Sequence, residues 1–223
     1  MIAAADGVRV LAVDASGKMM ARLRERAARL SASVRIDAET MDGTALKLPD
    51  ASFDAAISVF GVILFPDAGL GMREIARVLK PGGRAAIVTW TATERYELAA
   101  RLQGAIAKVR GPQSPPAFLP AQLRFREEPA FRGLLAEAGL IVQDIVRLEE
   151  QWRLPSARWL ADRIAFAPGM SAMVGALGAD RAPVLDAFVS ALERDRGQGE
   201  VALSAVAHMG IAAKPAAERL PPL

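Results

Sequence analysis

Residues 8–17, VRVLAVDASG, decide the fold because they join a short aliphatic strand to the start of a helix. The apolar run, bounded by Asp and Gly residues, is typical of a strand buried on both faces of a sheet. Beyond it, apolar residues recur at helical spacing from Met20 to Leu30. Ser16 is placed to cap the first turn. The stretch therefore predicts a strand that runs directly into an amphipathic helix.

The alternation of strand and helix continues to residue 90. Strands are predicted from Val34 and over residues 55–59 and 85–90, with a helix over residues 71–79. Pro81 and the two glycines after it end that helix. This order predicts an α/β fold, a Rossmann-like and mostly parallel sheet with helices on both faces. Ligands of such sheets bind at the carboxyl ends of the strands.

The second half of the chain supplies further helices and two long strands. After a predicted helix over residues 97–110, the segment Gly111 to Pro120 is rich in proline and predicts a loop. The elements expected beyond it are a helix that Gly139 ends, a strand over residues 141–154, helical segments near residues 156–167 and 182–194, and a last strand over residues 201–213.

The composition excludes several kinds of site. The chain has no cysteine and a single histidine, so disulfides, thiolate zinc and cysteine nucleophiles are excluded, and we expect no metal site. The net charge is +3, but basic and acidic residues are interleaved, as over residues 22–29. That pattern is typical of a solvated helix face, and we expect no nucleic acid partner. The longest apolar stretch, residues 55–65, is shorter than the roughly 20 residues of a membrane span. With no basic-then-apolar leader, a cytoplasmic location is expected.

Two acidic residues stand where ligands are expected. Asp14 ends the first strand, where a carboxylate can accept hydrogen bonds from a ribose diol or can join Ser16 in capping the helix. Asp42 lies just past the second strand, where it can accept a hydrogen bond from an adenine amino group or belong to a solvent-facing loop. Neither residue decides between these alternatives alone.

Taken together and in order, several stretches resemble the class I S-adenosylmethionine-dependent methyltransferases. The likeness is to the small-molecule branch that is similar to the enzymes of ubiquinone and menaquinone biosynthesis. The stretches are residues 10–16 with Met19, residues 42–43 with 48–54, residues 60–61 with 65–67, and residues 73–74 with 79–84, and a looser match covers residues 134–139 and the final strand.

The resemblance implies a site for S-adenosylmethionine, with S-adenosylhomocysteine as the product. Its residues would be Asp14 at the ribose, Ala15 and Met19 on the adenine, Asp42 and Gly43 at the adenine edge, and Val59 and Phe60 beside the methionine part. For Met19 and Phe60, packing in the protein core is the competing interpretation. The resemblance divides the chain into a cofactor-binding core, residues 1–110, and a part of the same domain, residues 111–223, that completes the sheet and covers the acceptor site.

The sequence departs from the family at its start, because the family's first strand and its glycine-rich loop have no counterpart here. We therefore expect a sheet without that central strand and with two apolar strand edges unpaired. Three interpretations remain open: a truncated chain, a non-catalytic relative whose sheet closes over the gap, and a strand supplied by a neighbouring chain.

The expected function is methyl transfer to a small apolar or phenolic acceptor. Methyl transfer needs positioning and only sometimes a base, so no catalytic residue is assigned. Trp90, Tyr96 and the segment Gly111 to Pro120 are expected near the acceptor. Trp152 and Trp159 would cover its pocket or belong to an ordinary core, and His208 is interpreted as a satisfied or edge histidine.

Two other functions compete with methyl transfer. One is a non-catalytic binding or dimerisation module, and the sequence is compatible with a homodimer. The other is a nucleotide-dependent oxidoreductase, which the absence of a G-x-G-x-x-G motif disfavours.

Overall fold

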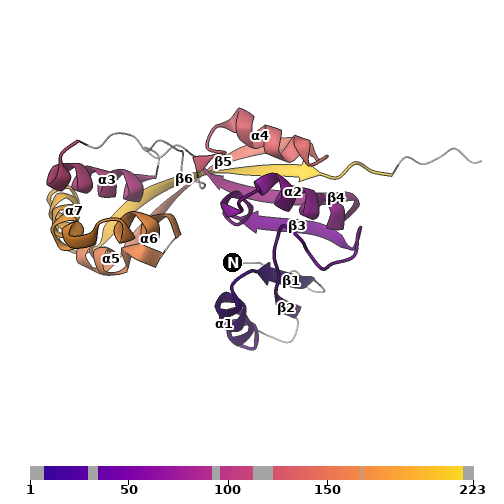
Figure 1. Ribbon diagram of the computed structural model, residues 1–223, viewed down its shortest axis with the longest axis horizontal. Coiled ribbons are helices and arrows are strands. Elements are labelled where there is room, and N and C mark those ends of the chain that lie inside the picture. Colours follow the sequence, from indigo (N-terminus) through magenta and orange to yellow (C-terminus); the bar gives the residue numbers. More distant parts are fainter. Residues whose placement is uncertain (1–7, 30–34, 92–95, 113–122, 167, 218–223) are drawn as a thin grey trace, which may run out of the picture.

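The computed structural model describes residues 8–29, 35–91, 96–112, 123–166 and 168–217, which form two separate β-sheets. The first sheet pairs β1 (Arg9–Asp14) with β2 (Arg35–Thr40) in parallel, and α1 (Gly17–Ala27) lies between them in sequence. The hydroxyl of Ser16 accepts a hydrogen bond from the Met19 amide at 3.3 Å, which confirms the predicted helix cap. In Figure 1 this unit lies below the larger sheet.

The second sheet has four strands in the order β3-β4-β6-β5. They are β3 (Phe53–Val59), β4 (Leu79–Trp90), β5 (Ile141–Leu154) and β6 (Val201–Ala213). β3 and β4 are parallel, whereas β6 runs antiparallel to both of its neighbours. The predicted parallel pairing is thus confirmed for β1–β2 and β3–β4, but in two sheets rather than one.

Helices lie on both sides of the larger sheet, as predicted, but they leave one face of β3 exposed. On one face, α2 (Ala68–Val78) and α4 (Glu128–Glu137) bury Met72, Phe131 and Leu135 against the strands. At the far end, α3, α5, α6 and α7 surround the long strands (Figure 1). Their bounds are α3 (Glu97–Arg110), α5 (Ala157–Arg163), α6 (Pro168–Gly175) and α7 (Arg181–Arg196), with short 3₁₀ helices η1 (Val62–Leu64), η4 (Ile164–Phe166) and η5 (Gly178–Asp180).

The connection Lys80-Pro81-Gly82-Gly83 forms a bulge inside β4. The pairing with β3 jumps from Phe53↔Leu79 to Ala55↔Arg84, so residues 80–83 have no opposite partner. Gly82 has φ +79°, a left-handed conformation that glycine adopts without steric cost. β4 therefore begins at Leu79, six residues before the predicted strand, while α2 ends close to the predicted point.

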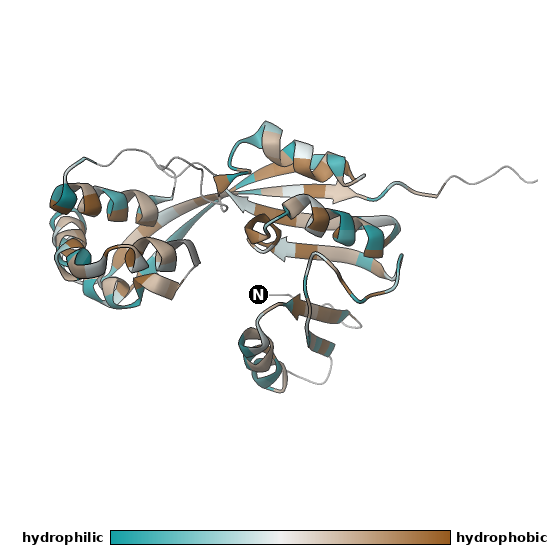
Figure 2. Ribbon diagram, viewed as in Figure 1, coloured by the Kyte–Doolittle hydropathy of each residue, from teal (hydrophilic) through white to brown (hydrophobic). Residues whose placement is uncertain are grey.

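The prediction of a strand buried on both faces is wrong for β1. All its residues are half-buried or exposed, and among the described residues only one of its edges is paired. β3 also has exposed apolar side chains, since Ile57 is 67% exposed and Val59 is 60% exposed. Figure 2 shows hydrophobic segments on both β1 and β3. Apolar side chains thus remain open to solvent on the two strands that border the gap between the sheets.

Candidate functional site

Asp14 closes β1 at the carboxyl edge of the small sheet. Its Oδ1 accepts a hydrogen bond from the amide of Ser16 at 2.7 Å, and its backbone oxygen accepts one from Met41 at 3.1 Å. Asp14 therefore takes part in the turn before α1, as the capping interpretation expects. Its other carboxylate oxygen has no hydrogen bond within the described part of the chain, so it is open to a ligand hydroxyl.

Asp42 lies beside Asp14 because β1 and β2 end together. The strands pair Asp14 with Thr40, which places Asp42 two residues beyond the same edge. The backbone amide and the hydroxyl of Thr44 both donate to Oδ1 of Asp42, at 2.8 and 2.7 Å. These hydrogen bonds lower the pKa of the exposed Asp42 carboxyl. The two acids thus form one carboxylate-lined edge, as expected for parallel strands.

Met19 is not a core residue. Its side chain is 52% exposed on α1, whereas the neighbouring Met20 is 6% exposed and belongs to the core. Ala15 is exposed in the turn before the helix. Core packing therefore does not explain Met19, and the exposed side chains of Met19 and Ala15 are available to a ligand.

The loop after β2 is anchored to α2 by a charged pair. The carboxylate of Glu74 accepts a hydrogen bond from the amide of Leu46 at 2.7 Å. Arg77 donates to the carbonyls of Leu46 and Leu48 at 2.9 and 2.7 Å and also to Glu74. The hydrogen bond from Arg77 holds the pKa of Glu74 below its usual range. This network fixes the loop that follows Asp42.

Gly43 connects this loop to the segment after β3. A Cβ on Gly43 would lie 2.3 Å from the ring of Phe65, and one on Gly71 of α2 would lie 2.4 Å from the same ring. Phe65 is therefore held between two glycines. This packing gives Gly43 a structural role that the sequence does not reveal, and its predicted contact with adenine stays a prediction.

Val59 and Phe60 lie at the carboxyl end of β3, in the other sheet. Phe60 has φ +56°, which is uncommon for a bulky residue and often marks a functional position. Its amide donates to the carbonyl of Val88 at 3.1 Å, and its ring stacks on Trp90 with centroids 3.9 Å apart. The structure thus places the predicted cofactor residues in two groups, Asp14 to Gly43 and Val59 with Phe60. Phe65, which follows the second group in sequence, packs against Gly43 of the first.

The stacked pair of Phe60 and Trp90 begins a row of aromatic rings. Trp90 stacks on Tyr96 at 4.6 Å, Tyr96 meets Trp152 edge-on at 6.1 Å, and Trp152 meets Phe166 at 5.5 Å. Tyr96 is buried, its hydroxyl has no hydrogen-bond partner in the described structure, and burial raises its pKa to about 12. We call these five residues the aromatic row.

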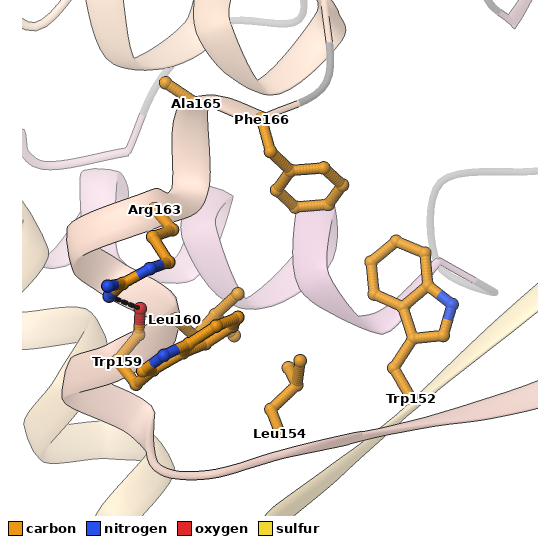
Figure 3. A pocket seen from close by; sticks show the side chains of 7 residues that line it. All are labelled: Trp152, Leu154, Trp159, Leu160, Arg163, Ala165 and Phe166. Atoms are coloured by element: carbon orange, nitrogen blue, oxygen red, sulfur yellow. Dashed lines mark hydrogen bonds between the residues drawn. The ribbon is translucent and has the colours of Figure 1, made fainter. Parts of the chain in front are cut away.

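The aromatic row ends at an apolar cleft of about 590 Å³. Figure 3 shows the lining side chains, which come from the end of β5 and from α5 and η4. They are Trp152, Leu154, Trp159, Leu160, Arg163, Ala165 and Phe166. Both tryptophans that were expected to cover a pocket or belong to a core thus line this cleft. Phe166 was missed, because a phenylalanine at the end of a helical segment gives no sequence signal of a cleft.

His208 lies on β6, opposite Thr89 of β4 and Arg147 of β5. It is not on an edge strand, and its buried Nδ1 has no hydrogen-bond partner among the described residues. The interpretation as a satisfied or edge histidine is therefore wrong. The predicted loop between Gly111 and Pro120 lies mostly outside the described residues.

In the described part of the chain, no cluster of three metal-ligating side chains occurs. No helix there combines the length and the apolar character needed to cross a membrane.

The known proteins to which this chain is similar include several methyltransferases. Residues 1–87 match the methyltransferase domain family. The chain is 33% identical over 93 residues to a phosphatidylethanolamine N-methyltransferase of Cereibacter sphaeroides, covering 42% of this chain and 46% of that protein. It is 37% identical over 95 residues to a ubiquinone/menaquinone biosynthesis C-methyltransferase of Geobacter sulfurreducens, covering 43% and 37%. The chain thus spans less than half the length of these relatives.

Solved structures agree on the fold. A putative methyltransferase from Bacillus halodurans matches with a TM-score of 0.55 and 14% identity, covering 93% of this chain and 84% of that one. A methyltransferase from Methanosarcina mazei matches with a TM-score of 0.54 and 16% identity, covering 94% and 84%. Residues 1–87 therefore match the methyltransferase domain family, and these solved structures share the fold of the chain.

Proposed function

We propose that this protein binds S-adenosylmethionine and transfers its methyl group to a small apolar acceptor. The observation that carries the proposal is the shared edge of Asp14 and Asp42, which follow the ends of two paired strands, together with the exposed Met19 in the first turn of α1. These groups are suited to bind an adenosine. The carboxylate oxygens can accept hydrogen bonds from the ribose diol and the adenine amino group, and the apolar side chain can pack on the base. The relatives named above support the reaction type.

In this proposal, Asp14 binds the ribose hydroxyls and Asp42 with Gly43 lies at the adenine edge. Ala15 and Met19 cover the ring. Val59 and Phe60 line the path of the methyl group, which the cofactor supplies as an activated sulfonium.

The role of the chain in the transfer is positioning. The acceptor atom forms its new bond to the methyl carbon as the sulfur–methyl bond breaks, and any acceptor proton leaves to solvent. Holding the two reactants in line supplies most of the rate enhancement, so a dedicated base is not required.

The acceptor class is supported by the apolar surroundings of Phe60. The stacked ring of Trp90 lies next to it, and the relatives include enzymes named for a phytyl naphthoquinone and for phosphatidylethanolamine. Residues 111–223 would provide the acceptor side of the site.

Calorimetric titration with S-adenosylhomocysteine tests the proposal. We expect micromolar binding by the chain, and about 10- to 100-fold weaker binding by Asp14→Asn, since hydrogen bonds to a charged group contribute roughly 1.5–3 kcal/mol. Asp37→Asn is the matched control, because Asp37 is an exposed acid on the adjacent strand β2. Its affinity should equal that of the unchanged chain.

Two results would overturn the proposal. One is the absence of binding by a chain that circular dichroism shows to be folded, which would favour a non-catalytic role. The other is equal loss of affinity in the Asp14 and Asp37 variants.

A further inference from the structure

The apolar cleft at the end of β5 lies apart from the proposed methyl-transfer point. Between Phe166 and Phe60, the rings of Trp152, Tyr96 and Trp90 pack against one another with centroids 3.9–6.1 Å apart, and Tyr96 is buried. Side chains packed in this way occupy the space that a path between the two places would need. A ligand of the cleft is therefore distinct from the methyl acceptor.

The size and lining of the cleft are those of a ligand site. Its volume of about 590 Å³ falls in the range of pockets that hold drug-sized molecules. Leu160, one of its lining residues, is 1% exposed and belongs to the core, whereas Trp159 is 37% exposed and Phe166 is 56% exposed. Open aromatic rings around a concave surface gain favourable burial when a flat apolar group packs against them. The cleft is thus suited to an aromatic group.

Arg163 adds a positive charge to this apolar surface. It is the only charged side chain among the described residues that line the cleft. Its guanidinium lies over the Trp159 ring, 4.7 Å from the centroid, and this contact holds it beside the cleft (Figure 3). Within the described part of the chain Arg163 makes no ion pair, whereas Arg158 of the same helix pairs with Asp186 at 3.0 Å. The charge at the cleft is therefore not neutralised by a described carboxylate.

The guanidinium of Arg163 also keeps hydrogen-bond donors for a ligand. Its Nη1 donates to the carbonyl of Trp159 at 3.4 Å, which is longer than a usual N–H···O hydrogen bond. An arginine carries five N–H donors in a planar fork that matches the two oxygens of a carboxylate. Because the Arg163 side chain is exposed, a ligand carboxylate can accept from these donors without displacing an acidic side chain among the described residues.

We propose that this cleft binds an aromatic carboxylate, whose ring packs among Trp159, Phe166 and Trp152 while its carboxylate accepts hydrogen bonds from Arg163. Charge complementarity supports this class of ligand, because the described lining contains one cation and no acidic side chain. The apolar lining disfavours a small inorganic anion, which would lose its hydration without gaining apolar contact. The proposal does not rest on the proposed methyl transfer, since the site requires no cofactor.

Calorimetric titration of the chain with 2-naphthoate, an aromatic carboxylate, tests the site without cofactor. We expect one site with micromolar affinity. The amide 2-naphthamide has the same shape without the charge and should bind about tenfold more weakly, because it loses the charge-assisted hydrogen bonds. The saturated acid decahydro-2-naphthoate keeps the charge and should bind about fivefold more weakly, because it cannot stack on the rings. Absence of 2-naphthoate binding by the folded chain, or equal affinity for the acid and its amide, would overturn the proposal.

Variants of two arginines on one helix assign the charge. Arg163→Gln should weaken 2-naphthoate binding about tenfold and leave the affinity for 2-naphthamide unchanged, because it removes the partner of the carboxylate alone. Arg158→Gln is the matched control, since Arg158 is also exposed but lies outside the cleft lining, and its loss changes the net charge equally. It should bind both compounds as the unchanged chain does. Equal loss of 2-naphthoate affinity in the two variants would indicate a general effect of charge and overturn the proposal.

Variants of exposed apolar residues locate the ring of the ligand. Phe166→Ser should weaken the binding of 2-naphthoate and of 2-naphthamide about fivefold, because both rings pack on Phe166. Val59→Ser is the comparison, since the exposed face of β3 is another apolar surface that could take the probe. Binding that persists in Phe166→Ser and disappears in Val59→Ser would place the probe on β3 and overturn the proposal.

Two further measurements test whether the cleft is free and separate. Analytical ultracentrifugation should show the same oligomeric state for the chain and for Phe166→Ser. A dimer that this substitution converts to a monomer would show that a second copy covers the cleft, which would overturn the proposal. Saturating S-adenosylhomocysteine should leave the 2-naphthoate affinity unchanged, because the packed aromatic row lies between the two sites. A tenfold change would overturn the separation of the cleft from the methyl-transfer site.

Discussion

Tyr96 shows how far burial changes the chemistry of one residue in this protein. Its ring is stacked on Trp90, and its hydroxyl has no hydrogen-bond partner among the described residues. Burial disfavours the phenolate and raises the pKa of Tyr96 from 10 to about 12. In the unfolded chain the same group ionises near its ordinary value.

This difference predicts a loss of stability at alkaline pH. Above pH 10 the unfolded chain releases the Tyr96 proton while the folded chain keeps it, so the free energy of unfolding falls as the pH rises toward 12. At about 1.4 kcal/mol per pKa unit, the full effect of the two-unit shift is roughly 3 kcal/mol. Urea unfolding of the chain and of Tyr96→Phe between pH 9 and 11 measures it.

Tyr96→Phe removes this contribution and also removes an unsatisfied hydroxyl. We therefore expect the variant to be as stable as the unchanged chain, or more so, at pH 7 and to lose less stability above pH 10. Because Tyr96 is the only tyrosine, absorbance at 295 nm follows its ionisation directly. Ionisation near pH 10 in the folded chain would contradict the prediction.

Only part of the candidate site could be predicted from the sequence. Asp14 and Asp42 could be placed at one sheet edge, because parallel strands bring their carboxyl ends together. The left-handed backbone of Phe60 and the cleft beside Phe166 could not be predicted. Both depend on contacts between segments far apart in the chain, and the local pattern of hydrophobic residues does not reveal such contacts.

At the scale of elements, a glycine allows α2 to pack closely against its neighbours. Gly71, in its first turn, lies against Phe65, and a Cβ there would be 2.4 Å from the ring. The ring cannot move freely, because Gly43 is on another side of it. We expect Gly71→Ala to destabilise the protein by about 1–3 kcal/mol through overpacking.

Gly104→Ala in α3 is the matched control. Gly104 also lies within a helix, but no atom lies within 4 Å of its Cβ position. Alanine there should stabilise the protein by about 0.5–1 kcal/mol, because it reduces the freedom of the unfolded chain. Thermal unfolding of both variants measures this difference. Equal stability of Gly71→Ala and Gly104→Ala would show that the Phe65 ring moves to accommodate the added methyl group.

The helices and strands themselves were largely predictable. The helix over residues 97–110 and the strands over residues 141–154 and 201–213 have the predicted bounds, since their length and clear ends at glycine or polar residues leave little choice. β4 was predicted too short, because the proline and two glycines were interpreted as a turn between helix and strand, whereas here they form a bulge within the strand. α6 was not predicted.

At the scale of the whole molecule, the two sheets differ in how firmly they are held. β6 pairs with a strand on each side and has many buried residues. Among the described residues, β1 pairs only with β2, and it has no fully buried residue. In the described part of this unit, from residue 8 to residue 40, the buried apolar side chains are Met20 and Ala38.

Hydrogen exchange should resolve this difference. Local stability follows buried contacts and paired backbone, so we expect the amides of β1 and β2 to exchange at least tenfold faster than those of β6. Mass spectrometry of exchange at pH 7 measures both in one sample, with β6 as the internal control. Equal protection of the two sheets would mean that contacts such as Gly43 with Phe65 suffice to join them into one cooperative unit.

If the proposed cofactor site forms between Asp14 and Phe60, S-adenosylhomocysteine should slow exchange in β1 and β2 while leaving β6 unchanged, because a ligand stabilises the part of the structure that it bridges.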